Sequence, residues 1–136
     1  MSSANLDLVR SIYGAWEHGD FSSVEWAHPE IECVSTEPLI PLDATGTAEL
    51  GRVWGSWLHA WNGFHIDADG HREVDGERVL TLLRYGGRDR LDGQEVMPTE
   101  AATLYHVRDG KVTRLVIYWD RDRAFADLGL TPDTGT

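Results

Sequence analysis

The chain has 136 residues, the size of one domain, and 41% of them are hydrophobic. Its net charge is −11, and Lys111 is the only lysine beside eleven arginines. Because phosphate contacts need clustered positive charge, this balance argues against binding to nucleic acid or to an anionic membrane. Cys33 is the only cysteine, which excludes a disulfide within the chain. We find no signal peptide and no apolar run near the ~20 residues of a membrane span, so we expect a cytoplasmic protein.

The first half of the chain has two segments with apolar residues at helical spacing. One covers about residues 4–18 and ends before Gly19, which suits the position after a helix. The other starts near Thr47, and its apolar stripe consists of Leu50, Val53, Trp54, Trp57, Leu58 and Trp61. Between the two segments, residues 30–34 alternate like a short strand.

The second half of the chain alternates apolar and polar residues as strands do. These runs cover 64–74, 77–85, 97–107 and 111–119, and Arg108-Asp109-Gly110 is a hairpin signal. A short helix follows from Asp120 to about Leu128. Helices followed by four consecutive antiparallel strands predict an α+β fold, with a curved antiparallel sheet wrapped around the N-terminal helices as a cone with an internal pocket. We expect one domain over residues 1–130 and a flexible tail over 131–136.

Two long stretches, "LVRSIYGAWEHGDFSSVEWAHPEIECV" and "RDGKVTRLVIYWDRDRAFADLGL", carry a family resemblance. The chain resembles the SnoaL-like branch of the nuclear-transport-factor-2-like, or cystatin-like, superfamily over nearly its whole length. The resemblance implies a hydrophobic pocket in the cone and a homodimer through the convex side of the sheet. Members include polyketide cyclases, ketosteroid isomerases, limonene epoxide hydrolases and dehydratases, and others have no known activity.

The acids of these relatives do not fall on acids here. The inward acid on the last long strand of the cyclases corresponds to Ile117, and the Asp base of the isomerases falls at or near Cys33. The helix tyrosine of the isomerases falls at Ile12, one residue before Tyr13. The resemblance therefore implies a pocket without implying a ready catalytic set.

The strand pattern nevertheless predicts a site inside the cone. Glu32 is the one carboxylate that we place there, as a general acid or base, with Tyr85 and Tyr105 as hydrogen-bond donors to developing oxyanion charge. Alternatively, Glu32 pairs with an arginine or reaches solvent. The expected ligand-binding residues are Ile12, Trp16, Val34, Trp57, Trp61, Leu83, Ala101, Thr103, Leu115, Ile117 and Trp119.

Three other features have competing interpretations. Strict alternation puts the acidic and histidine side chains of "HIDADGH" (65–71) on one strand face. Successive side chains on that face are ~6.6 Å apart, which is too far for all of them to bind one metal ion. We therefore expect no metal and no cofactor. Cys33 is either a nucleophile or, as we favour, a small buried residue. Asp120 is either catalytic or, as we favour, the N-cap of the last helix.

The predicted function follows from the pocket. We expect a protein that binds a small, largely apolar or polycyclic carbonyl compound, with cyclisation, isomerisation or dehydration as the reaction if it is an enzyme. The alternative is a non-catalytic ligand-binding or assembly domain of the same fold. A homodimer is also expected, because outward-facing positions of the strands form an apolar surface of Leu80, Leu82, Ala102, Leu104, Val116 and Tyr118.

Overall fold

The structure, a computed structural model, describes residues 4–17, 25–36, 43–59, 61–89 and 95–130, without the side chains at 56–65, 85 and 87–99. Within these residues the chain forms three helices and one six-stranded sheet. The helices are α1 (Ala4–Glu17), α2 (Thr47–His59) and α3 (Arg121–Leu128). The strands are β1 (Ala27–Ser35), β2 (Ala44–Thr45), β3 (Trp61–Asp75), β4 (Arg78–Asp89), β5 (Glu95–Arg108) and β6 (Lys111–Tyr118).

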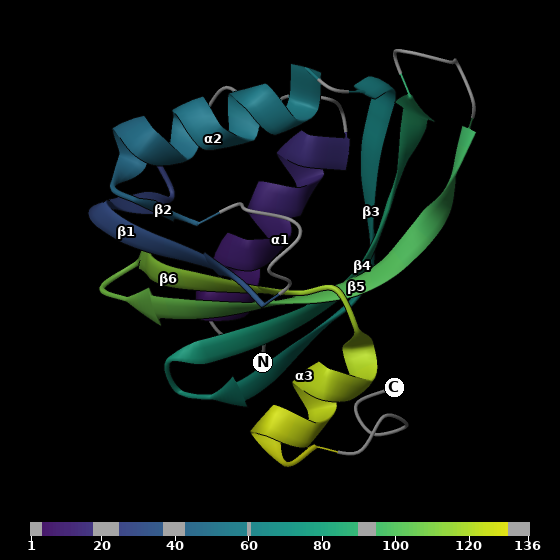
Figure 1. The fold of residues 1–136 in the computed structure, drawn as a ribbon. Coiled ribbons are helices and arrows are strands. Elements are labelled where there is room, and N and C mark those ends of the chain that lie inside the picture. The colour runs from purple at the N-terminus through teal and green to yellow at the C-terminus, as the bar shows by residue number, and fades with distance from the viewer. Residues whose placement is uncertain (1–3, 18–24, 37–42, 60, 90–94, 131–136) are drawn as a thin grey trace.

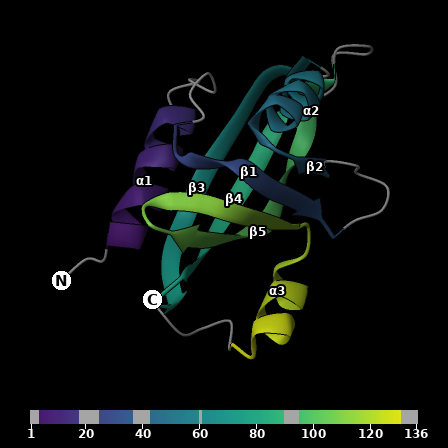
Figure 2. The same cartoon turned by 90° about the vertical axis from the view of Figure 1, so that its left-hand side faces the viewer.

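The sheet is mixed, with the strand order β2-β1-β6-β5-β4-β3. The four consecutive strands β3 to β6 are antiparallel, as predicted, whereas β1 pairs with β6 in parallel. The sheet curves around α1, with α2 across one end of the hollow and α3 on the outer side (Figures 1 and 2). This arrangement confirms the α+β class and the sheet wrapped around the N-terminal helices. The proposed tail at 131–136 lies outside the described residues.

α1 buries the stripe that its sequence predicted, whereas the stripe expected for α2 is confirmed only in part. In α1, Val9, Ile12, Tyr13 and Trp16 are buried at the i, i+3, i+4, i+7 spacing of one helix face. In α2, Leu50 is buried and Trp54 packs against the same core. These side chains meet the inner faces of β1, β4, β5 and β6, so the main core lies on the concave side of the sheet. α2 ends at His59, so Trp61, which was expected in this helix, begins β3 instead. The side chains of Trp57 and Leu58 lie outside the described residues.

β1 turns inward the face opposite to the expected one. Ile31 and Cys33 are 0% and 2% exposed, whereas Glu32 between them is exposed to solvent. The parallel register sets Cys33 beside the inward-facing Leu115. The expectation that Glu32 and Val34 point into the cone is therefore wrong. Alternation alone allows either facing, and burial of the more apolar alternate pair decides between them.

β3 contains an irregularity that changes its facing halfway along. Its pairing register with β4 shifts between Ala68 and Gly70. On one side of the shift Ala68 lies opposite Leu83, and beyond it His71 lies opposite Thr81 on the same, inner face. The strict alternation expected from the sequence is thus broken, because an extra residue in one strand sends the following side chains to the other face.

The hairpin between β5 and β6 forms as predicted. Asp109 and Gly110 have φ angles of 54° and 76°, the left-handed conformation at both central residues that a two-residue hairpin turn needs. β4 continues to Asp89, beyond the end of the strand expected over residues 77–85. The turn fixes Lys111 at the start of β6.

α3 covers the outer face of the sheet. Asp120 is its N-cap, as favoured, because its side chain accepts a hydrogen bond from the backbone N–H of Asp122. Gly129 ends the helix with φ 66°. Ala124 and Phe125 pack on the outward-facing apolar residues of the strands. Leu82 is half-buried there, and the other residues of this surface are buried: Leu80, Ala102, Leu104, Val116 and Tyr118. The expected exposed apolar surface is therefore covered within one chain.

Candidate functional site

Two tyrosines meet in the centre of the cone. Tyr105 of β5 donates a hydrogen bond from its hydroxyl to the hydroxyl oxygen of Tyr13 on α1, at 2.7 Å. The rings lie edge to face, with centroids 6.0 Å apart. Tyr13 is 1% exposed and Tyr105 is 0% exposed, so this bond forms out of contact with water. Tyr105 had been predicted as a donor in the site; its partner Tyr13 had not.

His71 joins the tyrosines from β3. Its ring centroid lies 5.5 Å from that of Tyr13, and its Nδ1 is 2.9 Å from the hydroxyl oxygen of Thr81. The sheet register continues this row, since Thr81 pairs with Thr103 on β5. We call Tyr13, His71, Thr81, Thr103 and Tyr105 the inner polar cluster.

α1 also supports the β3 irregularity that turns His71 inward. The carboxylate of Glu17, the last residue of α1, accepts a hydrogen bond from the backbone N–H of Ala68 at 3.1 Å. This N–H belongs to the residue at the register shift, where the regular ladder is interrupted. The helix that carries Tyr13 thereby helps to place His71 beside it.

Burial controls the protonation of the cluster. Burial raises the pKa of Tyr13 well above its usual value, although hydrogen bonds with Tyr105 and Thr103 act in the opposite direction. Burial, followed by the positive charge of Arg10, lowers the pKa of His71, against a smaller effect of Glu17. The cluster at neutral pH is therefore two neutral phenols beside a neutral imidazole, a set that can donate hydrogen bonds and accept a proton.

Aromatic rings extend the site towards α2. Trp16 lies edge to face with Tyr13, with centroids 5.0 Å apart, and stacks on Trp54 at 5.8 Å. Cys33 sits in the same core, and burial raises the pKa of its thiol to about 11, although the nearby indole N–H of Trp54 acts in the opposite direction. A thiol that stays protonated at neutral pH is a poor nucleophile, which supports the structural role for Cys33.

The other predicted site residues fall into three groups. Fully or nearly buried positions on the inner face or on α1 are Ile12, Trp16, Leu83, Ala101, Thr103, Leu115 and Ile117, and Trp119 is half-buried against the same core. Glu32 is exposed and Val34 lies beside Val116 of the outer face. The side chains of Trp57, Trp61 and Tyr85 lie outside the described residues.

Sequence reasoning missed Tyr13 and His71 for two different reasons. The family alignment placed the helix tyrosine at Ile12, one residue away, although Tyr13 belongs to the buried stripe of α1. His71 was assigned to the face of Asp69 because strict alternation was assumed. Gly70 was the available signal, since a glycine inside an alternating strand often marks a bulge.

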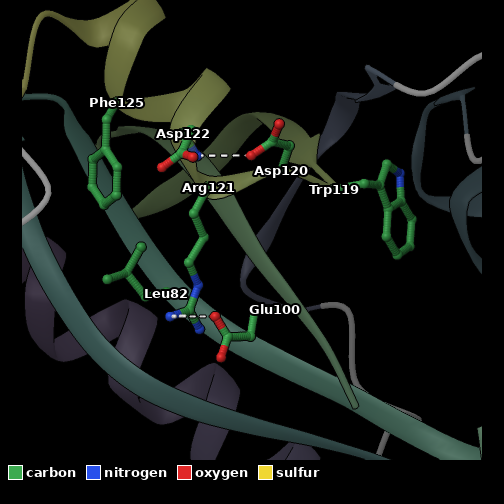
Figure 3. Close-up of a pocket in the computed structure, with 7 residues that line it drawn as sticks. All are labelled: Leu82, Glu100, Trp119, Asp120, Arg121, Asp122 and Phe125. Carbon is green, nitrogen blue, oxygen red and sulfur yellow. Dashed lines mark hydrogen bonds and ion pairs between the residues drawn. The ribbon is translucent and has the colours of Figure 1, made fainter. Parts of the chain in front are cut away.

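A second group of polar residues lies on the outer side of the sheet, beside a cleft of about 620 Å³ (Figure 3). Arg121 at the start of α3 points across the cleft towards Glu100 (Figure 3). Its guanidinium donates to Asp69 at 2.7 Å and to the backbone oxygens of Leu83 and Ala101 at 3.0 and 3.1 Å.

The Arg121 contacts are structural rather than ligand-binding. Burial alone would raise the pKa of Asp69, but hydrogen bonds from Arg121 and Arg84 outweigh it and lower this pKa. The guanidinium is already bonded to three protein oxygens. The arrangement therefore anchors α3 to the sheet.

Among the residues that the structure describes, no three His, Cys, Asp or Glu side chains are placed to share a metal ion. Asp69 and His71 lie on opposite faces of β3, because the register shift separates them. No helix in the described ranges is long and apolar enough to cross a membrane.

Solved structures of other proteins share this architecture. TerC, co-crystallized with polyporic acid, matches with a TM-score of 0.73 at 23% identity, over 93% of this chain and 98% of TerC. A nuclear-transport-factor-2-like protein of unknown function from Burkholderia pseudomallei K96243 matches with a TM-score of 0.75 at 16% identity, over 92% and 97% of the two chains. A Mycobacterium tuberculosis protein in complex with estradiol-17beta-hemisuccinate matches with a TM-score of 0.70 at 14% identity, over 89% and 97%. At such identities the likeness shows a shared fold alone.

Sequence comparison adds the family. Among curated proteins, none matches the chain. The family model of the SnoaL-like domain matches residues 9–115. This range includes most of α1, the strands β1 to β5, the start of β6, and both tyrosines of the inner polar cluster. The chain therefore belongs to the SnoaL-like domain family and has the nuclear-transport-factor-2-like fold.

Proposed function

We propose that this protein binds a small, largely apolar carbonyl compound inside the cone and transfers a proton on it. The observation that carries the proposal is the buried hydrogen bond between Tyr105 and Tyr13, with the half-buried imidazole of His71 beside it. The ring centroids of His71 and Tyr13 are 5.5 Å apart. Two fold neighbours hold ring compounds, polyporic acid and estradiol-17beta-hemisuccinate, which supports a ligand of this general kind.

The proposed roles follow from the hydrogen-bonding capacity of the cluster. Tyr13 accepts the proton of Tyr105 and keeps its own O–H, which would donate to the carbonyl oxygen of the ligand. A phenol that accepts one hydrogen bond is a stronger donor of another. Neutral His71 would take the proton from the carbon beside the carbonyl, and the phenols would stabilise the developing enolate oxygen. Proton transfer of this kind supports cyclisation, isomerisation or dehydration.

The second candidate is a non-catalytic ligand-binding or assembly domain. One observation favours it: the described inner-face positions of β1, β4, β5 and β6 carry no carboxylate, and Glu32 points to solvent. Under this alternative the cluster and the tryptophans would provide affinity alone. The two candidates differ in whether His71 is needed for turnover.

The test uses polyketide-like and steroid-like ketones, screened by quenching of tryptophan fluorescence. Exchange of the ligand's α-hydrogen for deuterium, followed by NMR, then reports proton transfer. If the enzymatic proposal holds, His71→Gln leaves affinity nearly unchanged and slows exchange by about 10²-fold or more. Tyr13→Phe should weaken binding about fivefold, the value of one hydrogen bond.

Matched controls lie on the outer face of the sheet. His106 is half-buried with a pKa lowered by burial, like His71, and Tyr118 is 6% exposed. His106→Gln and Tyr118→Phe should therefore leave binding and exchange unchanged. Binding without exchange by the unmodified protein would support the non-catalytic alternative, and exchange that survives His71→Gln would rule out His71 as the base.

The homodimer implied by the family resemblance belongs to the same proposal. Because α3 covers the apolar outer face, a dimer on this side would use α3 and the charged rim around it rather than a bare sheet. Sedimentation at micromolar concentration tests this, with a monomer counting against the dimer.

A further inference from the structure

A second cleft lies between α1 and the hairpin that joins β5 to β6. Its volume is about 330 Å³, within the size range of small-ligand pockets. One wall is a face of α1 with Leu8, Ile12 and Ala15, and the opposite wall comes from residues 25–26 and 110–111. No member of the inner polar cluster lines this flank cleft, so it is separate from the site proposed above.

Aromatic side chains form a rigid corner in the flank cleft. Trp16 and Trp26 both line it, with ring centroids 5.9 Å apart and planes at 80°. Ile12 and Trp16 are 3% and 7% exposed and are held by the core, whereas Trp26 is half-buried. Two flat apolar surfaces at nearly a right angle suit an aromatic ring, which can stack on one indole and meet the other edge to face.

The rim of the flank cleft carries the only lysine of the chain. The ammonium of Lys111 donates to the backbone oxygen of Glu25, which holds it at the cleft. An ammonium has three N–H donors, and this bond uses one of them. Among the described residues, no carboxylate forms an ion pair with Lys111. Glu25 also lines the cleft, and its negative charge opposes an anion there.

We propose that the flank cleft binds a small aromatic carboxylate. The ring occupies the corner between Trp16 and Trp26, and the carboxylate accepts hydrogen bonds from the two remaining N–H groups of Lys111. Charge complementarity selects the anion, because Lys111 is the one cation that lines the cleft among the described residues.

The test compares two probes of equal shape on the full chain: 1-naphthaleneacetate and its neutral amide, 1-naphthaleneacetamide. Titrations followed by ¹H–¹⁵N NMR should shift the backbone amides of Gly110 and Lys111 and the indole N–H of Trp26. Lys111→Met should weaken binding of the acid by about two- to fivefold, as for an exposed ion pair, and leave binding of the amide unchanged. Glu25→Gln should strengthen binding of the acid.

Two further variants control for charge and for shape. Arg114→Met removes an exposed cation outside the cleft and should leave both affinities unchanged. Ala15→Trp fills the cleft and should abolish binding of both probes. Equal affinity of Lys111→Met and the unmodified protein for the acid would overturn the proposal. So would shifts centred on Tyr13, Thr103 and Tyr105, or shifts at Gly110 that grow with protein concentration alone, which would assign the cleft to a second copy of the chain.

Discussion

At the scale of residues, the hydroxyl groups of Tyr13 and Tyr105 are the polar groups whose pairing matters for the stability of the buried core. A phenol buried in an apolar core needs a hydrogen-bond partner, and each of these two provides one for the other. Truncating one partner therefore has two effects: it removes a bond and leaves a buried polar group behind. Removing both hydroxyls leaves neither tyrosine oxygen without its partner.

We predict that Tyr13→Phe and Tyr105→Phe each lower the free energy of unfolding by about 1–2 kcal/mol. The double variant should cost less than the sum of the two, by about 1 kcal/mol, because neither oxygen is then left without a partner. Urea unfolding of the four proteins measures this coupling. Strict additivity would show that the hydrogen bond contributes nothing to stability.

His71 makes stability depend on pH. Its pKa in the folded chain lies below the ordinary value of 6.5, mainly because burial disfavours the charged ring. The unfolded chain therefore binds this proton first as the pH falls. The corresponding stability is present above the unfolded-state pKa and is lost as the pH falls towards the folded-state pKa.

We predict that unfolding free energy falls less steeply between pH 7 and pH 5 in His71→Gln than in the unmodified protein. Burial also lowers the pKa of His106, so His106→Gln should reduce the slope in the same way, and the double variant should reduce it further. Urea unfolding at several pH values gives the slopes. A His71→Gln slope equal to that of the unmodified chain would contradict a depressed pKa.

At the scale of elements, the first residue of α3 adds a polar anchor to the apolar packing of Ala124 and Phe125 on the sheet. Arg121 reaches Asp69 on β3 and the backbone oxygens of Leu83 on β4 and Ala101 on β5. One side chain thereby joins the helix to three strands. The planar guanidinium can serve these oxygens together because its donors diverge in a fixed fork.

We predict that Arg121→Met destabilises the fold by about 2 kcal/mol, because charged hydrogen bonds are lost and partly buried acceptors lose their donor. Arg121→Lys should recover little, since a single ammonium cannot reproduce the fork. Arg123, two residues along, has a side chain 58% exposed, so Arg123→Met should change stability by at most about 0.5 kcal/mol. Denaturant unfolding measures all three, and equal losses for Arg121→Met and Arg123→Met would refute the anchoring role.

At the scale of the whole molecule, the sheet separates two apolar clusters. The larger one fills the hollow with α1 and α2, and the smaller one lies between the sheet and α3. Among the residues whose side chains the structure describes, both clusters are buried within one chain. The outer cover is a single short helix of eight residues.

We predict that deleting residues 120–136 causes self-association. The deletion uncovers Leu80, Leu104, Val116 and Tyr118, which are at most 9% exposed in the intact chain. A contiguous exposed apolar patch of this kind drives association. Sedimentation and binding of an apolar dye should both increase relative to the intact chain; an unchanged sedimentation profile would show that α3 is not the cover.

Local patterns in the sequence were sufficient for several parts of the fold. The spacing of Val9, Ile12, Tyr13 and Trp16 defines a helix face in any context, because helical periodicity is a property of the backbone. Asp109-Gly110 likewise encodes its turn locally, through residues that accept positive φ. The order of helices and strands, together with the family resemblance, was then enough to identify the cone.

The site depended on choices that only tertiary packing makes. A strand has two faces, and a shift of one residue exchanges them, so the inward face of β1 is decided by which residues meet the core rather than by alternation alone. Ile31 and Cys33 take that position, and Glu32 is left in solvent. At Gly70 a single extra residue in β3 separates Asp69, which binds Arg121, from His71, which joins Tyr13. Tyr13 and His71 are 58 positions apart in the sequence, and no local pattern contains partners that distant.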